Sequence, residues 1–292
     1  MGAKLTALIP CKDERRNIRP CIESVRPIAD EILIADSGST DGTLDVVRSI
    51  GGCRIIEREY VNSANFKNWA IPQARHEWVL LVDADERIPE KLGEEIRAVL
   101  AAPPAEFDGY WIARDGHYLG HRIRHCGWDR DDVIRLFRRD VSRYHPRHVH
   151  AEVDLPPHRV GKLRTPLLHF TTWSTDDYLR KMIRYAQWGA MNLREEKAAR
   201  GRFWPMLMRA PLRFLQLYVL RLGFLDGIPG LQICAITAFY SFLKQAKLWE
   251  MDHALAQPDP EAETDGVAAT LDFSEAARSR REVSHEQKRR AA

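Results

Sequence analysis

Short apolar runs alternate with helix-like segments between residues 5 and 100, and this rhythm constrains the fold more than any other feature. The strand-like segments cover residues 5–9, 32–35, 54–57 and 78–82, of which 54–57 has charged ends, with amphipathic segments near 18–25, 44–50 and 65–74 between them. Uninterrupted apolar runs of this length are typical of strands buried on both faces, and the helices between them give right-handed crossovers. The pattern predicts an α/β fold with a Rossmann-like, mostly parallel sheet.

The rhythm changes along the rest of the chain. Pro89 begins a further helix that we expect to end near Leu100, before Pro103 and Pro104. Short β-type segments then follow at 110–112, 133–137 and 167–170, among His, Arg and Asp residues. We therefore predict one domain over 1–172, with a nucleotide-binding half (about 1–105) and an acceptor half (about 106–172), a helical region over 173–251 and a disordered tail over 252–292.

Charge and cysteine content exclude several classes of protein. The net charge of +3 is too small to predict nucleic-acid binding, and the five cysteines lack the spacing of a zinc site or a disulfide framework. The amino terminus enters the first apolar run without the long apolar region of a signal peptide, so we expect the catalytic part to stay in the cytoplasm.

The helical region carries a local excess of positive charge. Between Arg180 and Arg221 there are ten Lys or Arg residues against two Glu. The uncharged run that follows, Gly227 to Leu243, is shorter than the roughly 20 residues needed to cross a bilayer. We expect this region to face an anionic membrane surface and to lie in its interface or form a re-entrant hairpin, with amphipathic helices.

Two acidic loops follow buried strands. One runs from Asp36 to Thr43, and the other is Asp83-Ala84-Asp85. Loops at the carboxyl edge of a parallel sheet are where open α/β sheets bind ligands. Carboxylate oxygens are the ligands that hard divalent cations prefer, so we predict that Asp85, with help from Asp83, holds a cation, although isolated Asp-X-Asp triplets are also common in solvated turns.

Several residues near these loops are candidates for nucleotide contacts. Asp36 can accept a hydrogen bond from a base or ribose, and Glu14 lies at the tip of the neighbouring strand, as do Pro10 and Asp13. Lys67 could equally be an ordinary solvated surface lysine or a residue that contacts the nucleotide. The predicted nucleotide-binding residues are Pro10, Asp13, Glu14, Asp36, Ser37, Lys67, Asn68, Asp83, Arg135 and Arg138, the two arginines through guanidinium–diphosphate pairing.

The acceptor half contains the candidates for a general base. His148, His150 and Glu152 alternate along the chain, so in a strand they would point the same way. Any of them, or a carboxylate of the preceding acidic loop, could take a proton from a hydroxyl group. The candidates kept open are Glu152, His150 and one of Asp129, Asp131 and Asp132.

These motifs together resemble the family-2 inverting glycosyltransferases, and most closely the lipopolysaccharide core enzymes of that family. The resemblance covers Leu5 to Glu250. The matching motifs are Ala29 to Ile32, Asp36 to Thr43, Lys67-Asn68, Asp83 to Arg87, Gly127-Trp128, Arg135 to Arg139 and Gly223 to Gly227. The last motif, in the carboxyl-terminal part, makes the match specific. One departure is that the family's Val-His-Glu reads Val149-His150-Ala151-Glu152 here.

The resemblance implies the GT-A nucleotide-diphospho-sugar transferase fold and transfer of a hexose from a UDP-sugar donor, with glucose as the leading candidate for that hexose. It also implies a glycolipid acceptor, a heptose of the lipopolysaccharide inner core. Carried over to this chain, Asp36 and Asp83 would contact the nucleoside and Asp85 would hold Mg²⁺ or Mn²⁺. We expect a peripheral enzyme at the cytoplasmic face of a bacterial inner membrane. A polyprenyl-phosphate glycosyltransferase and a non-catalytic sugar-nucleotide-binding scaffold are the alternatives.

Overall fold

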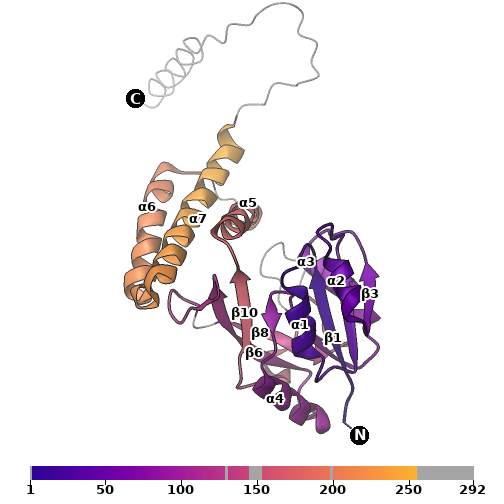
Figure 1. Ribbon diagram of the computed structural model, residues 1–292. Coiled ribbons are helices and arrows are strands. Elements are labelled where there is room, and N and C mark those ends of the chain that lie inside the picture. The colour runs from indigo at the N-terminus through magenta and orange to yellow at the C-terminus, as the bar shows by residue number, and fades with distance from the viewer. Residues whose placement is uncertain (1, 129–130, 145–152, 198–199, 255–292) are drawn as a thin grey trace, which may run out of the picture. The chain divides into compact units, whose positions relative to one another are not determined.

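One mixed sheet organises the amino-terminal part of the chain (Figure 1). The computed structural model describes residues 2–128, 131–144, 153–197 and 200–254. The strands are β1 (Leu5–Cys11), β2 (Glu31–Asp36), β3 (Cys53–Glu57), β4 (Trp78–Leu81), β5 (Glu86–Arg87), β6 (Gly109–Tyr118), β7 (His121–Arg122), β8 (Asp132–Arg138), β9 (Val160–Lys162) and β10 (Leu167–Thr172).

The strand order shows how the two halves of the sheet join. Neighbouring strands follow the order β3-β2-β1-β4-β8-β6-β10-β5, and β7 and β9 also pair with β6. The first four strands are parallel, whereas β8 is antiparallel to both β4 and β6. The predicted mostly parallel sheet is therefore confirmed, and β8 carries it into the second half of the domain.

Helices cover both faces of the parallel half. They are α1 (Ile18–Val25), α2 (Thr43–Ile50), α3 (Ser63–Ala70) with a short 3-10 helix (Ile71–Gln73), and α4 (Glu90–Ala101). Side chains of a strand alternate between faces. Accordingly Ile9 of β1 packs in the cluster that contains Ile22 of α1 and Ile96 of α4, while its neighbour Leu8 packs in the cluster that contains Phe66 of α3. The predicted helices are confirmed within a few residues of their expected ends.

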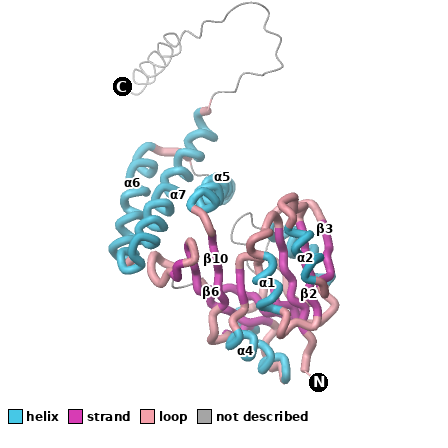
Figure 2. The backbone as a smooth tube through the Cα atoms, in the orientation of Figure 1, coloured by secondary structure: helices cyan, strands magenta, loops and turns pink. Residues whose placement is uncertain are grey.

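The chain beyond the sheet is helical (Figure 2). It contains α5 (Thr175–Lys197), α6 (Phe203–Leu215), a π-helical turn (Gln216–Leu220), a 3-10 helix (Gly223–Asp226) and α7 (Gly227–His253). Helices α5 and α6 each pack against α7. The sequence run 227–243 is thus the first part of one continuous helix in this structure.

The motif Gly223 to Gly227 ties the helices to the sheet domain. The carboxylate of Asp226 accepts hydrogen bonds from the backbone amide of Arg124 at 3.2 Å, and from the backbone amide and Nδ1 of His125 at 2.8 and 2.9 Å. A Cβ added at Gly230 would lie 2.1 Å from the carbonyl oxygen of Gly223, so only glycine permits this close approach. The motif that made the family resemblance specific therefore has a structural role in docking α7.

No helix in the described part of the chain has both the length and the apolar character needed to cross a membrane unaided. The segments Phe203–Leu220 and Gly223–His253 meet the criterion only when taken together, and they are bent by 73° relative to each other.

Candidate functional site

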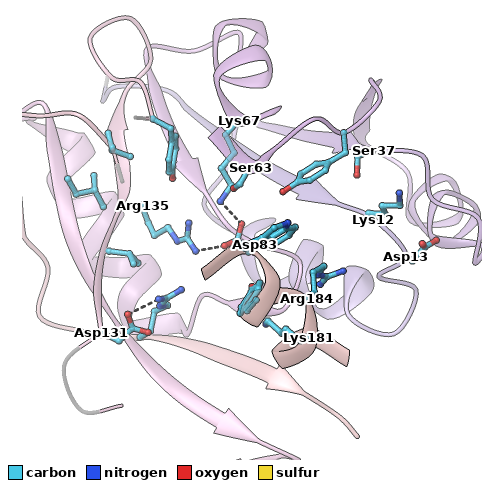
Figure 3. A pocket seen from close by; sticks show the side chains of 18 of the residues that line it. Lys12, Asp13, Ser37, Ser63, Lys67, Asp83, Asp131, Arg135, Lys181 and Arg184 are labelled. Carbon is cyan, nitrogen blue, oxygen red and sulfur yellow. Dashed lines mark hydrogen bonds and ion pairs between the residues drawn. The ribbon is translucent and has the colours of Figure 1, made fainter. Parts of the chain in front are cut away.

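A cavity of about 950 Å³ lies where loops of the sheet meet the side of α5 (Figure 3). Its volume is at the upper end of the range of roughly 300–1,000 Å³ that is usual for ligand sites. The first half of the sheet domain contributes Lys12, Asp13, Ser37, Tyr60, Ser63, Lys67 and Asp83, and the second half contributes Trp111, Arg114, Asp131 to Arg135, Tyr144 and Val153. Residues of both predicted halves therefore line one cavity.

Two positively charged side chains, from elements far apart in the sequence, hold Asp83. Its Oδ1 lies 3.1 Å from Nζ of Lys67 on α3, and its Oδ2 accepts a hydrogen bond from Arg135 on β8 (Figure 3). Burial alone would raise the pKa of Asp83, but the charges and hydrogen bonds of Arg135 and Lys67 outweigh it and hold the pKa far below its ordinary value. Asp83 is therefore an ionised and oriented carboxylate.

Arg135 also pairs with Glu86, which belongs to the Asp83 to Arg87 motif but was not predicted as a site residue. Nη2 of Arg135 lies 2.6 Å from Oε1 of Glu86, and both side chains are buried. Oε2 of Glu86 in turn accepts a hydrogen bond at 3.0 Å from the backbone amide of Asp83. Burial raises the pKa of Glu86 despite the opposing charge of Arg135. This buried network fixes the turn that carries Asp83 and Asp85.

Asp85 faces a histidine that the sequence did not predict as a site residue. Nε2 of His169 on β10 lies 3.4 Å from Oδ2 of Asp85, and the amide of Phe170 donates a 2.8 Å hydrogen bond to the carbonyl oxygen of Asp85. Burial raises the pKa of Asp85, but the interaction with His169 outweighs it and lowers the pKa overall. The described residues contain no cluster of three or more metal-binding side chains. Asp85 and His169 form a two-membered carboxylate–imidazole pair.

Asp36 is buried beneath its own loop. Its Oδ2 accepts 2.8 Å hydrogen bonds from the backbone amides of Gly38 and Ser39, and the side chain has no exposed surface. The carboxylate therefore shapes the loop, with Gly38 at a φ of 88°, whereas the adjacent Ser37 reaches the cavity. Asp36 therefore has a structural role in this loop, and its predicted nucleotide contact stays a prediction.

The tip of β1 lies beside that loop, as the sequence predicted. Oδ1 of Asp13 accepts a 2.7 Å hydrogen bond from the amide of Thr40, and Asp13 lines the cavity. Glu14 accepts a 2.8 Å hydrogen bond from Asn17, and burial raises the pKa of Glu14 to about 7. Pro10 lies within β1, in register with Ala35 of β2.

Asn68 and Arg138 make their contacts outside the cavity. Asn68 exchanges two hydrogen bonds with the backbone of Tyr144, at 2.7 and 2.9 Å. Arg138 pairs with Glu77 and lies 3.5 Å from Asp108. Neither is among the residues that line the cavity. Asn68 thus anchors the chain at Tyr144, and Arg138 forms an ion pair at the end of β8. Their nucleotide contacts stay predictions.

Among the candidates for the general base, Asp131 and Asp132 both line the cavity. Oδ1 of Asp131 lies 2.6 Å from Nη2 of Arg114 on β6. Oδ2 of Asp132 lies 2.6 Å from Nζ of Lys162. His150 and Glu152 lie outside the described residues, as do Asp129 and His148. The choice among these bases stays a prediction.

The wall formed by α5 was missed as part of the site. Asp177, Arg180, Lys181, Arg184, Tyr185 and Trp188 all line the cavity. The excess of basic residues after Arg180 indicated an anionic partner but not that several of these side chains face the same cavity as Asp83. Their spacing of three or four residues, which places them on one face of a helix, was the available signal.

Comparisons with known proteins agree with this architecture. The model of Glycosyl transferase family 2 matches residues 6–150. The lipopolysaccharide core biosynthesis glycosyltransferase LpsC of Rhizobium meliloti (strain 1021) is 32% identical over 265 residues, which cover 87% of this chain and 95% of LpsC. An uncharacterized glycosyltransferase of Rickettsia typhi is 26% identical over 261 residues, which cover 85% of this chain and 87% of the relative.

Among solved structures, a mannosyltransferase of Pyrobaculum calidifontis in complex with GDP-Man and Mn²⁺ is 14% identical, with a TM-score of 0.46 over 88% of this chain and 77% of that one. The glucosyl-3-phosphoglycerate synthase of Mycobacterium tuberculosis is 21% identical, with a TM-score of 0.33 over 40% of this chain and 44% of that one. From the family match and the full-length relative, the chain belongs to glycosyl transferase family 2, and its mixed, mostly parallel sheet with carboxyl-terminal helices is a GT-A fold.

Proposed function

We propose that this glycosyltransferase transfers a hexose from a UDP-sugar to a heptose of the lipopolysaccharide inner core, with inversion at the anomeric carbon. Glucose is the hexose that we propose. The observation that carries this proposal is the single cavity that joins Asp13 and Ser37 of the nucleotide side to Asp83 and to Asp131 of the acceptor side. A direct displacement needs both substrates in one site. Similarity to LpsC over nearly the whole chain supports a lipopolysaccharide acceptor.

The residues at the Asp83–Asp85 turn fit Mg²⁺ or Mn²⁺. Mg²⁺ is usually bound through one or two protein carboxylates, with phosphate oxygens and waters completing the shell, so a large protein cluster is not required. Asp85 would hold the cation through its carboxylate, the type of ligand that suits both Mg²⁺ and Mn²⁺, and His169 lies beside it. Asp83 is already neutralised by Lys67 and Arg135, so its part is to orient the turn and the donor. The bound cation would supply charge neutralisation for the departing diphosphate.

The chain's own residues perform the remaining steps. Ser37 and Asp13 bind the nucleoside end of the donor, and Asp131 or a base from residues 148–152 takes the proton of the acceptor hydroxyl. That oxygen then attacks the anomeric carbon from the side opposite the leaving group. A single displacement inverts the configuration.

A panel of UDP-sugars tests the proposal. Purified protein is incubated with Mg²⁺ or Mn²⁺ and a truncated core acceptor, and UDP release is measured. We expect release from UDP-glucose only with acceptor present, and a product with inverted anomeric configuration by NMR. Binding of UDP without sugar transfer would instead indicate a scaffold, and transfer to polyprenyl phosphate alone would replace the proposed acceptor.

We also propose that α6 and α7 hold the enzyme on the cytoplasmic face of the inner membrane. The exposed large apolar side chains between residues 203 and 231 are Phe203, Trp204, Leu207, Met208, Leu212, Leu215, Val219, Leu220, Leu222, Phe224, Leu225, Ile228 and Leu231. Soluble proteins seldom expose so many neighbouring apolar groups. The exposed residues Arg202, Arg209 and Arg221 on the same elements would pair with anionic headgroups.

Charge placed in this apolar surface is expected to abolish membrane binding. In the double variant Trp204→Glu/Leu212→Glu, two side chains that are 68% and 62% exposed become anionic. Burial of such side chains contributes about 1.5–3 kcal/mol each, so binding should weaken by more than about tenfold. Co-sedimentation with phosphatidylglycerol vesicles measures this. The matched control is Val141→Glu, which alters an exposed apolar residue of the sheet domain; equal binding by both variants and the wild type would overturn the proposal.

A further inference from the structure

We infer that α5 carries a diphosphate clamp, in which Lys181 and Arg184 bind the phosphate oxygens of the donor nucleotide from the side of the cavity that faces the Asp83 turn. The inference rests on the proposed function, because it assigns a ligand within the same site. It adds a binding role for a helix that lies outside residues 6–150, the part matched by the family model.

The first step is the position of the two positively charged side chains on α5. Lys181 and Arg184 are three residues apart on α5, and both line the cavity together with Asp83. Figure 3 shows their side chains on the opposite side of Asp83 from Lys67. A phosphate group next to the Asp83 turn would therefore be approached by positive charge from α5 as well as from the sheet.

The second step is the balance of charge within the cavity. The positive charges of Lys67, Arg135, Arg114 and Arg180 are each paired with a carboxylate. Within the described ranges, the structure pairs Lys181 and Arg184 with no carboxylate.

Their partners are instead aromatic. Nζ of Lys181 lies 6.0 Å from the ring centre of Tyr185, and the guanidinium carbon of Arg184 lies 5.6 Å from that of Trp188. Ring contacts of this kind orient a cation without neutralising its charge. Both cations therefore remain available for an anionic ligand.

The third step distinguishes the donor from the acceptor as the source of that anion. Lys181 and Arg184 share the cavity with Lys12, Asp13 and Ser37, which directly follow β1 and β2. These three residues belong to the nucleotide half of the domain, which favours the donor diphosphate over a phosphate on the acceptor.

The chemistry of transfer explains why the clamp matters. When the acceptor oxygen forms its bond to the anomeric carbon, the bond from that carbon to the β-phosphate oxygen breaks and its electron pair stays on the diphosphate. The acceptor proton goes to the general base. Guanidinium and ammonium groups placed at the phosphate oxygens stabilise this growing charge in the transition state.

Equilibrium binding tests the clamp without turnover. Calorimetry compares UDP, GDP and ADP with their nucleosides, using the wild type, Lys181→Met, Arg184→Met and the double variant. We expect the double variant to bind UDP about 10–100-fold more weakly, as for loss of charge-assisted hydrogen bonds, with uridine binding unchanged. Lys91→Met, which removes an exposed charge from α4, is the matched control and should bind UDP like the wild type.

Other outcomes separate this inference from the proposed function. If the wild type binds GDP or ADP in place of UDP, the proposed identity of the donor nucleotide is wrong. The same variants would then test the clamp with the nucleotide that binds. Equal diphosphate binding by the wild type and the double variant would overturn the clamp alone. In a kinetic assay, a rise in the KM for the acceptor without a change in the KM for the donor would also overturn it, and would assign Lys181 and Arg184 to a phosphate of the acceptor. Failure to bind any of the three diphosphates would overturn both.

Discussion

The variant Asp85→Ala is expected to lose sugar transfer by about a thousandfold or more while keeping its fold. The carboxylate is the ligand predicted to hold the divalent cation, and without the cation the negative charge that develops on the departing diphosphate is not neutralised. The backbone of Asp85 would still accept the hydrogen bond from Phe170, so the turn should persist. UDP release measures activity, and circular dichroism measures the fold.

A direct measurement of metal binding accompanies this prediction. Titration of Mn²⁺ in the presence of UDP, followed by electron paramagnetic resonance, should show weaker binding by Asp85→Ala than by the wild type. Asp45→Ala on α2 is the control, because its side chain is 82% exposed and pairs only with Arg48 in the described part of the chain. Full turnover by purified Asp85→Ala would refute the metal role of Asp85.

The variant Arg135→Met is expected to lose about 3–5 kcal/mol of unfolding free energy, because it leaves the buried charge of Glu86 and the partly buried charge of Asp83 with one partner fewer. For a domain of this size the melting temperature should fall by roughly 6–20 °C. Urea denaturation measures the difference. Arg138→Met is the matched control: its partner Glu77 is 58% exposed, and its other neighbour Asp108 keeps two hydrogen bonds from Arg159, so the expected loss is below about 1 kcal/mol.

The effect of Arg135→Met should depend on pH. A carboxyl group with a lowered pKa stabilises the folded state above its unfolded pKa, and this contribution disappears as pH falls through the lowered value. Arg135 is the first cause that lowers the pKa of Asp83. The Asp83 part of the deficit should therefore be full at pH 7 and shrink below about pH 4, where Asp83 takes up a proton in the variant. Burial already raises the pKa of Glu86, so Glu86 should take up its proton at a higher pH. A deficit independent of pH would assign the loss to packing instead of charge. Glu86→Gln in the Arg135→Met background should restore part of the stability.

Much of the first half of the fold could be predicted from local pattern. Helix α1 begins at Ile18 and ends at Val25 as expected, because Ile18, Cys21, Ile22 and Val25 recur at helical spacing and all are buried. The position of Asp83 after β4 followed from the apolar run that precedes it. Such signals are local, since they depend only on which side of an element meets the core.

The partners of the site residues were less predictable. Asp36 was expected to contact the nucleoside, yet its oxygens bind Gly38 and Ser39 of its own loop. Asn68 was grouped with Lys67, but a step of one residue on a helix turns a side chain by about 100°, so Lys67 reaches Asp83 whereas Asn68 reaches Tyr144. The assignments to His150 and Glu152 remain predictions.

The sequence by itself determined the α/β class, the order of the elements and the place of the acidic turn, because burial periodicity and strand-end motifs are written into neighbouring residues. Only the tertiary structure decided that His169 faces Asp85, that Arg135 joins Asp83 to Glu86, and that α5 turns Lys181 toward the same cavity. These pairs lie far apart along the chain. Their geometry depends on strand order and helix packing, which set distances of a few ångströms that no local pattern encodes.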